Sequence, residues 1–114
     1  MTHKEINDYI LSFPDTWLDY PFDKKTATYK IGHVAESNSK MFALIAEGSI
    51  PLRLSLKCDP LLAIQLREDY ETVLPGHNLN KKNWNTILCT GQVPDDEIKS
   101  LITLSYHLVN AEIA

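Results

Sequence analysis

The sequence predicts an α+β domain with an antiparallel sheet of about four strands and three helices packed mainly on one face. Strand-like segments run together at 28–34, 41–47 and 50–57, a fourth follows at 84–90, and helices do not alternate with them. Short turns join the first three segments, whereas parallel neighbours would need long crossovers. Within 50–57 leucines alternate with polar residues, so one face of the sheet should remain uncovered.

Local signals place the three helices. Thr2 and Glu5 have the spacing of a capping box, and an apolar stripe with helical periodicity follows them. Asp59 suits the N-cap of a second helix, with Pro60 at its first position. A third helix is predicted after Pro94, where three carboxylates would face the positive end of the helix dipole.

Length and composition indicate a globular protein with one domain over residues 1–114. The stretch 15–25 contains a proline and reads as an irregular crossing loop. No apolar run is long enough for a transmembrane helix, and the first residues lack the apolar core of a signal peptide. Cys58 and Cys89 lack CxxC spacing, so we expect reduced thiols and a cytoplasmic location.

The segment 75–88 is the main candidate for a binding surface. It combines two turn-forming residues, four asparagines, two lysines, a histidine and a tryptophan ahead of a predicted strand. Lysines could neutralise phosphates, asparagines could form hydrogen bonds, and the indole could stack on an exposed base. The polar face of strand 50–57 would extend the patch if that strand lies beside the fourth. The candidate residues are Lys81, Lys82 and Trp84, with Arg53, Lys57, His77 and Asn80 as further members.

Two other interpretations of these residues remain open. In the first, Trp84 anchors the loop in the core while the lysines are only solvated. The formal charge of −4 and the pI near 5.5 also disfavour a protein that binds nucleic acid by charge alone. In the second, the uncovered sheet face binds a protein or a small ligand, which requires an apolar or pocketed face in place of a positive one.

A cysteine-dependent enzyme is the third and least favoured interpretation. Cys58 lies just before a predicted helix start, where the pKa of a thiol can be lowered, and His77 or His33 could act as a base. The adjacent Asp59 opposes thiolate formation, and cysteine is among the residues most often buried. The histidines show no zinc spacing, so we expect no metal site and no cofactor.

The chain resembles the MmcQ/YjbR family over nearly its whole length. The resemblance is carried by segments in order at 21–22, 40–44, 56–60, 66–67, 75–76, 80–84 and 105–109. It implies a compact α+β fold similar to the CyaY (frataxin-like) arrangement, in small bacterial cytoplasmic proteins often labelled DNA-binding. It also implies a histidine where this chain has Asn83. The sequence therefore favours a non-enzymatic binding module, with DNA as the ligand that the resemblance implies.

Overall fold

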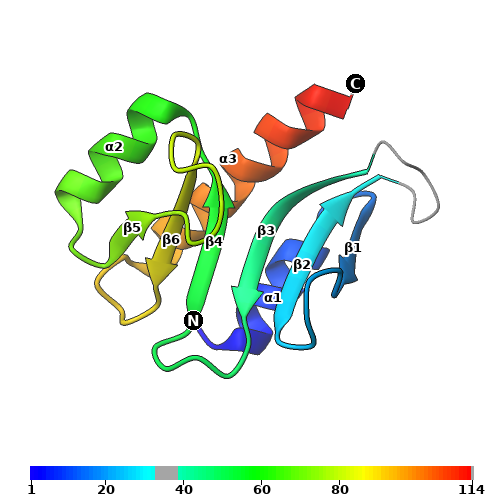
Figure 1. Cartoon of the computed structure of the whole chain (residues 1–114), viewed down its shortest axis with the longest axis horizontal. Helices are drawn as coiled ribbons and strands as arrows, with labels where there is room; N and C mark the ends of the chain where they lie inside the picture. The colour runs from blue at the N-terminus through cyan, green and yellow to red at the C-terminus, as the bar shows by residue number, and fades with distance from the viewer. Residues whose placement is uncertain (33–38, 114) are drawn as a thin grey trace.

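The computed structural model describes residues 1–32 and 39–113. The described elements form one antiparallel sheet with helices against it (Figure 1). Their bounds are α1 (His3–Leu11), β1 (Thr16–Asp19), β2 (Thr26–Ile31), β3 (Lys40–Ala46), β4 (Arg53–Lys57), α2 (Pro60–Asp69), β5 (Val73–Pro75), β6 (Trp84–Leu88) and α3 (Asp95–Ile113).

The described part of the sheet has six strands in the order β1-β2-β3-β4-β6-β5, so the prediction of about four strands is wrong. The two additional strands are the edges. Strand β1 has four residues and lies inside the stretch that was expected to be an irregular loop. Strand β5 has three residues and pairs with β6 from Val73 to Pro75. Both strands are too short for an alternation of polar and apolar residues to be recognised in the sequence. They are defined by their pairing, β1 with β2 and β5 with β6.

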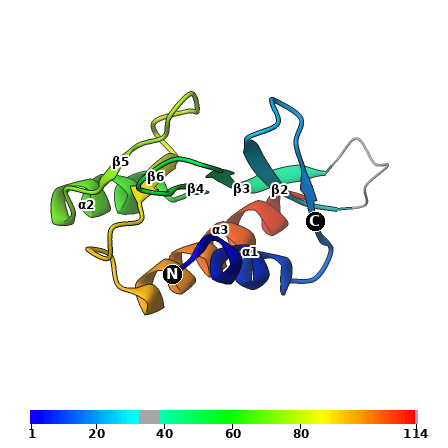
Figure 2. The same ribbon diagram turned by 90° about the horizontal axis from the view of Figure 1, so that it is seen from below.

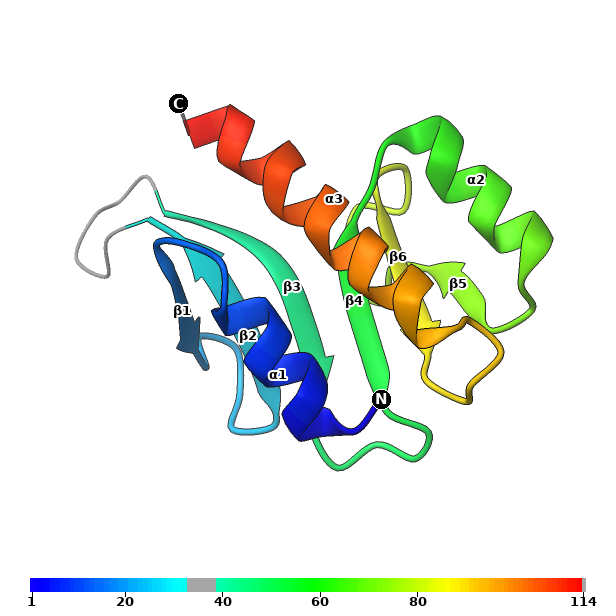
Figure 3. The ribbon, with the colours of Figure 1, turned by 180° about the vertical axis from the view of Figure 1, so that it is seen from behind.

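The helices cover one face of this sheet. Helices α1 and α3 lie on the same side, and α2 packs against β5 and β6 near the edge (Figure 2 and Figure 3). The predicted capping box is confirmed, because Thr2 and Glu5 each bond the backbone N–H of the other. No helix in the described part of the chain combines the length and the apolar character needed to cross a membrane.

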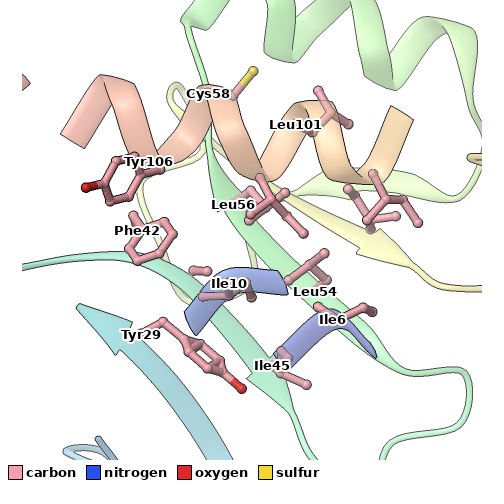
Figure 4. Close-up of a cluster of buried hydrophobic side chains, with 14 of the residues drawn as sticks. Ile6, Ile10, Tyr29, Phe42, Ile45, Leu54, Leu56, Cys58, Leu101 and Tyr106 are labelled. Atoms are coloured by element: carbon pink, nitrogen blue, oxygen red, sulfur yellow. The ribbon is translucent and has the colours of Figure 1, made fainter. Parts of the chain in front are cut away.

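The core lies between the sheet and these helices. Ile6 and Ile10 of α1 are fully buried, as the helical stripe predicted. They lie above the strands, while Tyr106 of α3 lies against Phe42 (Figure 4). The rings of Phe42 and Tyr106 meet edge to face with centroids 5.6 Å apart. Tyr106 is therefore a packing residue of the core.

Strand β3 contains a bulge at Phe42. Tyr29 of β2 pairs with Ala43 but the next residue, Lys30, pairs with Met41, so Phe42 is the extra residue. The bulge changes which residues face the helices, because Phe42 and Ala43 are both fully buried. From Leu44 onward, alternate residues of β3 face away from α1 and α3. This opposite side of the sheet, called here the open face, holds the candidate site.

Candidate ligand groove on the open face of the sheet

Two rows of paired residues make up the part of the open face that holds the groove. Because directly paired residues of an antiparallel sheet lie on the same face, the strand register assigns each row. One row has a partly hydroxylic surface, and the other contains a single charged residue. The first is Thr28, Leu44, Ser55 and Thr86, and the second is Thr26, Ala46, Arg53 and Leu88.

Two loops stand on either side of these rows. The β1–β2 loop and the β5–β6 loop both project from the open face, away from α1 and α3 (Figure 2). Together with the sheet they enclose a groove of about 440 Å³. Its rims are residues 22–23 of the first loop and residues 77–79 of the second. The groove is therefore formed by two hairpin loops and the sheet surface between them.

Hydroxyl groups line the floor of the groove. Ser55 Oγ and Thr86 Oγ1 are 2.8 Å apart, and the backbone N–H of His77 donates to Thr86 Oγ1 at 3.1 Å. Each hydroxyl carries one proton, and only one of these two protons takes part in the hydrogen bond between Ser55 and Thr86. Across the described ranges, no protein acceptor is found for the remaining O–H. This O–H can therefore be donated to a molecule in the groove.

The β5–β6 loop is fixed on the sheet at its first residues. Gly76 N–H donates to the carbonyl oxygen of Trp84 at 2.8 Å. A Cβ atom at Gly76 would lie only 2.7 Å from Trp84 Cβ, so the close approach requires glycine. Asn78 follows with φ of 57°, in the left-handed region that asparagine tolerates. This backbone geometry holds His77 and Leu79 at the rim.

The β1–β2 loop is fixed by polar contacts on the other side. The Tyr20 hydroxyl donates to Glu47 Oε1 at 2.7 Å, which ties the start of the loop to the end of β3. The Lys25 N–H donates to Asp23 Oδ1 at 2.8 Å, and this bond lowers the pKa of the Asp23 carboxyl below its usual range. Asp23 therefore remains ionised at neutral pH. Phe22, between these anchors, is 63% exposed at the rim.

Trp84 does not belong to an exposed surface, and the prediction that it stacks on a base is wrong. The residue is only 6% exposed. Trp84 begins β6, and the backbone of Gly76 lies directly against its Cβ atom. Trp84 is buried against the start of the β5–β6 loop, as the alternative interpretation requires, although it lies outside the main core cluster. The polar neighbours in the sequence gave no information about the direction of this side chain.

The predicted cations separate into different environments. Arg53 lies on the open face and lines the groove, together with His77. Strands β4 and β6 are neighbours, as the extended patch required. Lys57, however, forms an ion pair with Glu112 of α3 at 2.7 Å, and its side chain is 17% exposed. The ammonium group of Lys57 is thus held by a residue of α3, and Lys57 does not line the groove, so it does not extend the positive patch as predicted.

The remaining predicted residues lie further along the β5–β6 loop. Lys81 and Lys82 are exposed, and neither lines the groove. Lys81 Nζ donates to the carbonyl oxygen of Gly76 at 3.4 Å, and the guanidinium of Arg67 donates to the Lys81 carbonyl oxygen. Asn80 Oδ1 accepts from the Lys82 N–H at 3.1 Å, which is a turn contact. This part of the loop is a separate exposed surface beside the groove.

Cys58 lies on the other side of the sheet from His77. The thiol lines a small apolar cleft of about 120 Å³ between α2, α3 and the core face, and Cys58 is 8% exposed. Burial, followed by the charge of Asp59, raises the pKa of Cys58 to about 11. The structure therefore does not bring Cys58 and His77 together. His33 lies outside the described residues.

Sequence reasoning missed most of the groove. Leu44, Ser55 and Thr86 form its floor, and Phe22 and Asp23 form one rim. Ser55 was visible as part of a polar strand face, but its partners depend on strand register. A polar residue between two leucines of a strand was the only local signal for this floor.

The comparisons with known proteins agree with this fold. A family model described as YjbR matches residues 11–108. The chain is 32% identical over 106 residues to the uncharacterised protein YjbR of Escherichia coli (strain K12), covering 93% of this chain and 85% of that protein. It is 31% identical over 119 residues to the uncharacterised protein YyaQ of Bacillus subtilis (strain 168), covering 95% and 98%.

Solved structures show the same architecture. The crystal structure of the Deinococcus radiodurans protein DR2400 superposes with a TM-score of 0.90 at 35% identity, covering 96% of this chain and 78% of that one. A crystal structure of a Pseudomonas syringae protein gives a TM-score of 0.77 at 27% identity, covering 96% and 99%. The groove residues, from Phe22 to Thr86, all fall within the segment that the family model matches. This chain belongs to the YjbR family.

Proposed function

We propose that the protein is a non-enzymatic binding module whose small-molecule ligand occupies the groove on the open face. The observation that carries the proposal is the hollow between the two loops. Its volume of about 440 Å³ lies within the range of about 300–1,000 Å³ that is usual for small-molecule sites. An uncovered sheet without such loops would offer only a flat polar surface.

The lining supports the same proposal. Phe22, Leu44 and Leu79 supply apolar surface, whereas Ser55 and Thr86 supply a directed hydroxyl group. Small-molecule sites commonly combine a mainly apolar lining with a few polar groups that fix orientation. Phe22 is 63% exposed, and a bound molecule would remove part of that apolar surface from water.

The non-enzymatic part of the proposal is supported by Cys58. A thiol with a pKa of about 11 is almost fully protonated at neutral pH and is a poor nucleophile. It also faces the helix side, away from the groove.

Nuclear magnetic resonance with a fragment library tests the proposal directly. We expect fragments to shift the backbone amide signals of His77, Ser55 and Thr86. Ala46→Phe places a ring on the groove floor and should abolish these shifts, because Ala46 lines the groove. Ala111→Phe adds the same ring at an exposed position on α3 and should leave them unchanged. A library without a groove binder, or equal binding by Ala46→Phe, would reject the proposal.

Binding of DNA is a second candidate, favoured by one observation. The β5–β6 loop exposes Lys81 and Lys82 beside His77 and Asn80, so cations and hydrogen-bonding groups share one projecting loop. Trp84 is buried and Lys57 is paired with Glu112, so few free cations remain in the predicted patch. Phosphate neutralisation would therefore contribute little to the affinity for DNA.

Fluorescence anisotropy with labelled single- and double-stranded DNA tests this candidate at low and high salt. If DNA binds through the loop, Lys81→Ala/Lys82→Ala should remove binding. Lys4→Ala/Lys99→Ala makes the same change in charge on the helices and should retain it. No binding at low salt would reject DNA as a ligand, and equal loss in both double variants would reject the β5–β6 loop as its binding site.

A further inference from the structure

We infer that the ligand of the groove is an organic monocarboxylate with an apolar body, whose carboxylate pairs with Arg53. This inference rests on the proposed function, because it names the class of molecule that the groove takes. It follows from the charge, the hydroxyl groups and the apolar surface around the groove.

Arg53 supplies the positive charge. It pairs with Ala46 on one side and Leu88 on the other, so neither neighbour in its row is an acid. Arg53 is exposed, and within residues 1–32 and 39–113 its guanidinium has no ion pair or hydrogen bond to a protein group. A guanidinium offers a planar pair of donors that matches the two oxygens of a carboxylate. Among described lining residues, it is the only Lys or Arg.

Asp23 limits the ligand to one negative charge. Its ionised carboxylate sits on the rim by the β1–β2 loop, close to Thr26. Thr26 and Arg53 lie in the same row with Ala46 between them, so their backbones are about 10 Å apart across two strand spacings. A single carboxylate at Arg53 avoids Asp23, whereas a second anionic group extending along the row would approach it.

The apolar lining defines the rest of the molecule. Leu44 forms the floor beside Ser55, and Phe22 and Leu79 form facing parts of the two rims. An aromatic or branched aliphatic body would cover these side chains while its carboxylate reaches Arg53. The free O–H of the Ser55–Thr86 pair can be donated to a ligand oxygen on the floor.

The same lining disfavours a nucleic acid as the occupant of the groove. A phosphate backbone brings several negative charges and is held by several cations. Here Arg53 stands alone among the described lining cations and Asp23 opposes it. The groove therefore suits one oxyanion attached to an apolar group.

A matched pair of probes tests the inference: 2-naphthoate and 2-naphthamide, which have the same shape and differ in charge. Titrations are followed by the backbone amide signals of Ser55, His77 and Thr86. We expect naphthoate to bind about tenfold more tightly, as for the gain of one charge-assisted pair. Arg53→Gln should bring the two affinities together. Lys82→Gln removes a neighbouring cation outside the groove and should preserve the preference.

The outcomes separate the inference from the proposed function. If both naphthalenes bind the groove equally, or if Arg53→Gln retains the preference, the ligand class is wrong while the groove still binds small molecules. If fragments in the library screen bind the groove but the tight binders lack an acidic group, the ligand class is also wrong. If no compound shifts the groove signals, the proposed function itself fails. The amide spectrum of each variant shows whether it remains folded.

Discussion

The Ser105 hydroxyl donates a hydrogen bond to the carbonyl oxygen of Phe42 at 2.6 Å, and this contact joins helix α3 to the bulge in β3. The same hydroxyl oxygen accepts the backbone N–H of Lys57 at 3.0 Å. The bulge removes these two backbone groups from regular strand pairing, and a fully buried serine bridges them in its place. Ser105 is thus a structural residue and has no role in the groove.

Ser105→Ala should lower the free energy of unfolding by about 2–3 kcal/mol, because it leaves a buried carbonyl and a partly buried N–H without their partner. Urea denaturation followed by circular dichroism measures the change. Ser100→Ala is the control, since Ser100 is exposed on the same helix and donates only to the Asp96 carbonyl oxygen. Equal unfolding midpoints for the two variants would contradict this assignment.

Gly76→Ala should destabilise the protein by about 1–3 kcal/mol through overpacking against Trp84. The added Cβ would lie 2.7 Å from Trp84 Cβ, and the carbonyl oxygen of Trp84 at 3.0 Å prevents a simple shift. Thermal unfolding measures the effect, with Lys82→Ala on the same loop as the control. A Gly76→Ala protein as stable as this control would show that the loop can move away from the sheet.

Tyr20→Phe should loosen the rim of the groove that contains Phe22. The variant removes the hydrogen bond to Glu47, so we expect amide exchange in residues 20–25 to accelerate by about fivefold, equivalent to about 1 kcal/mol. Hydrogen–deuterium exchange followed by mass spectrometry provides the measurement. Tyr9→Phe removes a comparable hydroxyl contact, to Thr103, and should leave this loop unchanged. Equal exchange of the loop in both variants would refute the role of Tyr20.

Alkylation of Cys58 should be slow and should depend strongly on pH. Because the pKa is raised to about 11, the thiolate fraction at pH 8 is lower than for a free thiol and increases until the pH passes that value. In a Cys89→Ser variant we expect iodoacetamide to react about 100-fold more slowly than with N-acetylcysteine at pH 8. Urea should restore the ordinary rate. A native rate equal to that of the free thiol would revive the cysteine-dependent enzyme.

The sequence predicted those parts of the fold that depend on neighbours within one helical turn. The capping box at Thr2 and Glu5 formed as expected, and Asp59 Oδ2 accepts from the N–H groups of Leu61 and Leu62. Such caps join residues two or three positions apart, so their pattern is visible without the fold. The alternation of leucines in the third predicted strand also gave the correct faces for Leu54 and Leu56.

The rest depended on contacts between distant segments. Strand β1 exists because Thr16 pairs with Ile31, and β5 because Val73 pairs with Ile87. Arg67 of α2 likewise finds its partner on another element, because its Nε donates to the buried amide oxygen of Asn85 in β6 at 2.7 Å. None of these partners can be identified from residues nearby in the chain.

The groove could not be predicted from the sequence for the same reason. Its floor brings together Leu44, Ser55 and Thr86, which are far apart in sequence and meet only through the registers of β3, β4 and β6. The site prediction was based on the lysines and asparagines at 78–83 because they are close together in the sequence. Of the seven predicted site residues, only Arg53 and His77 line the groove.

The side chain of Phe22 on one rim is mostly in water, while the packed interior lies on the opposite side of the sheet. Substitutions at such turn positions therefore carry little thermodynamic penalty for the scaffold, yet they alter the outline that an incoming molecule meets. The rim of the groove and the packed interior are therefore set by separate parts of the chain, so the rim can vary among proteins that keep the same interior.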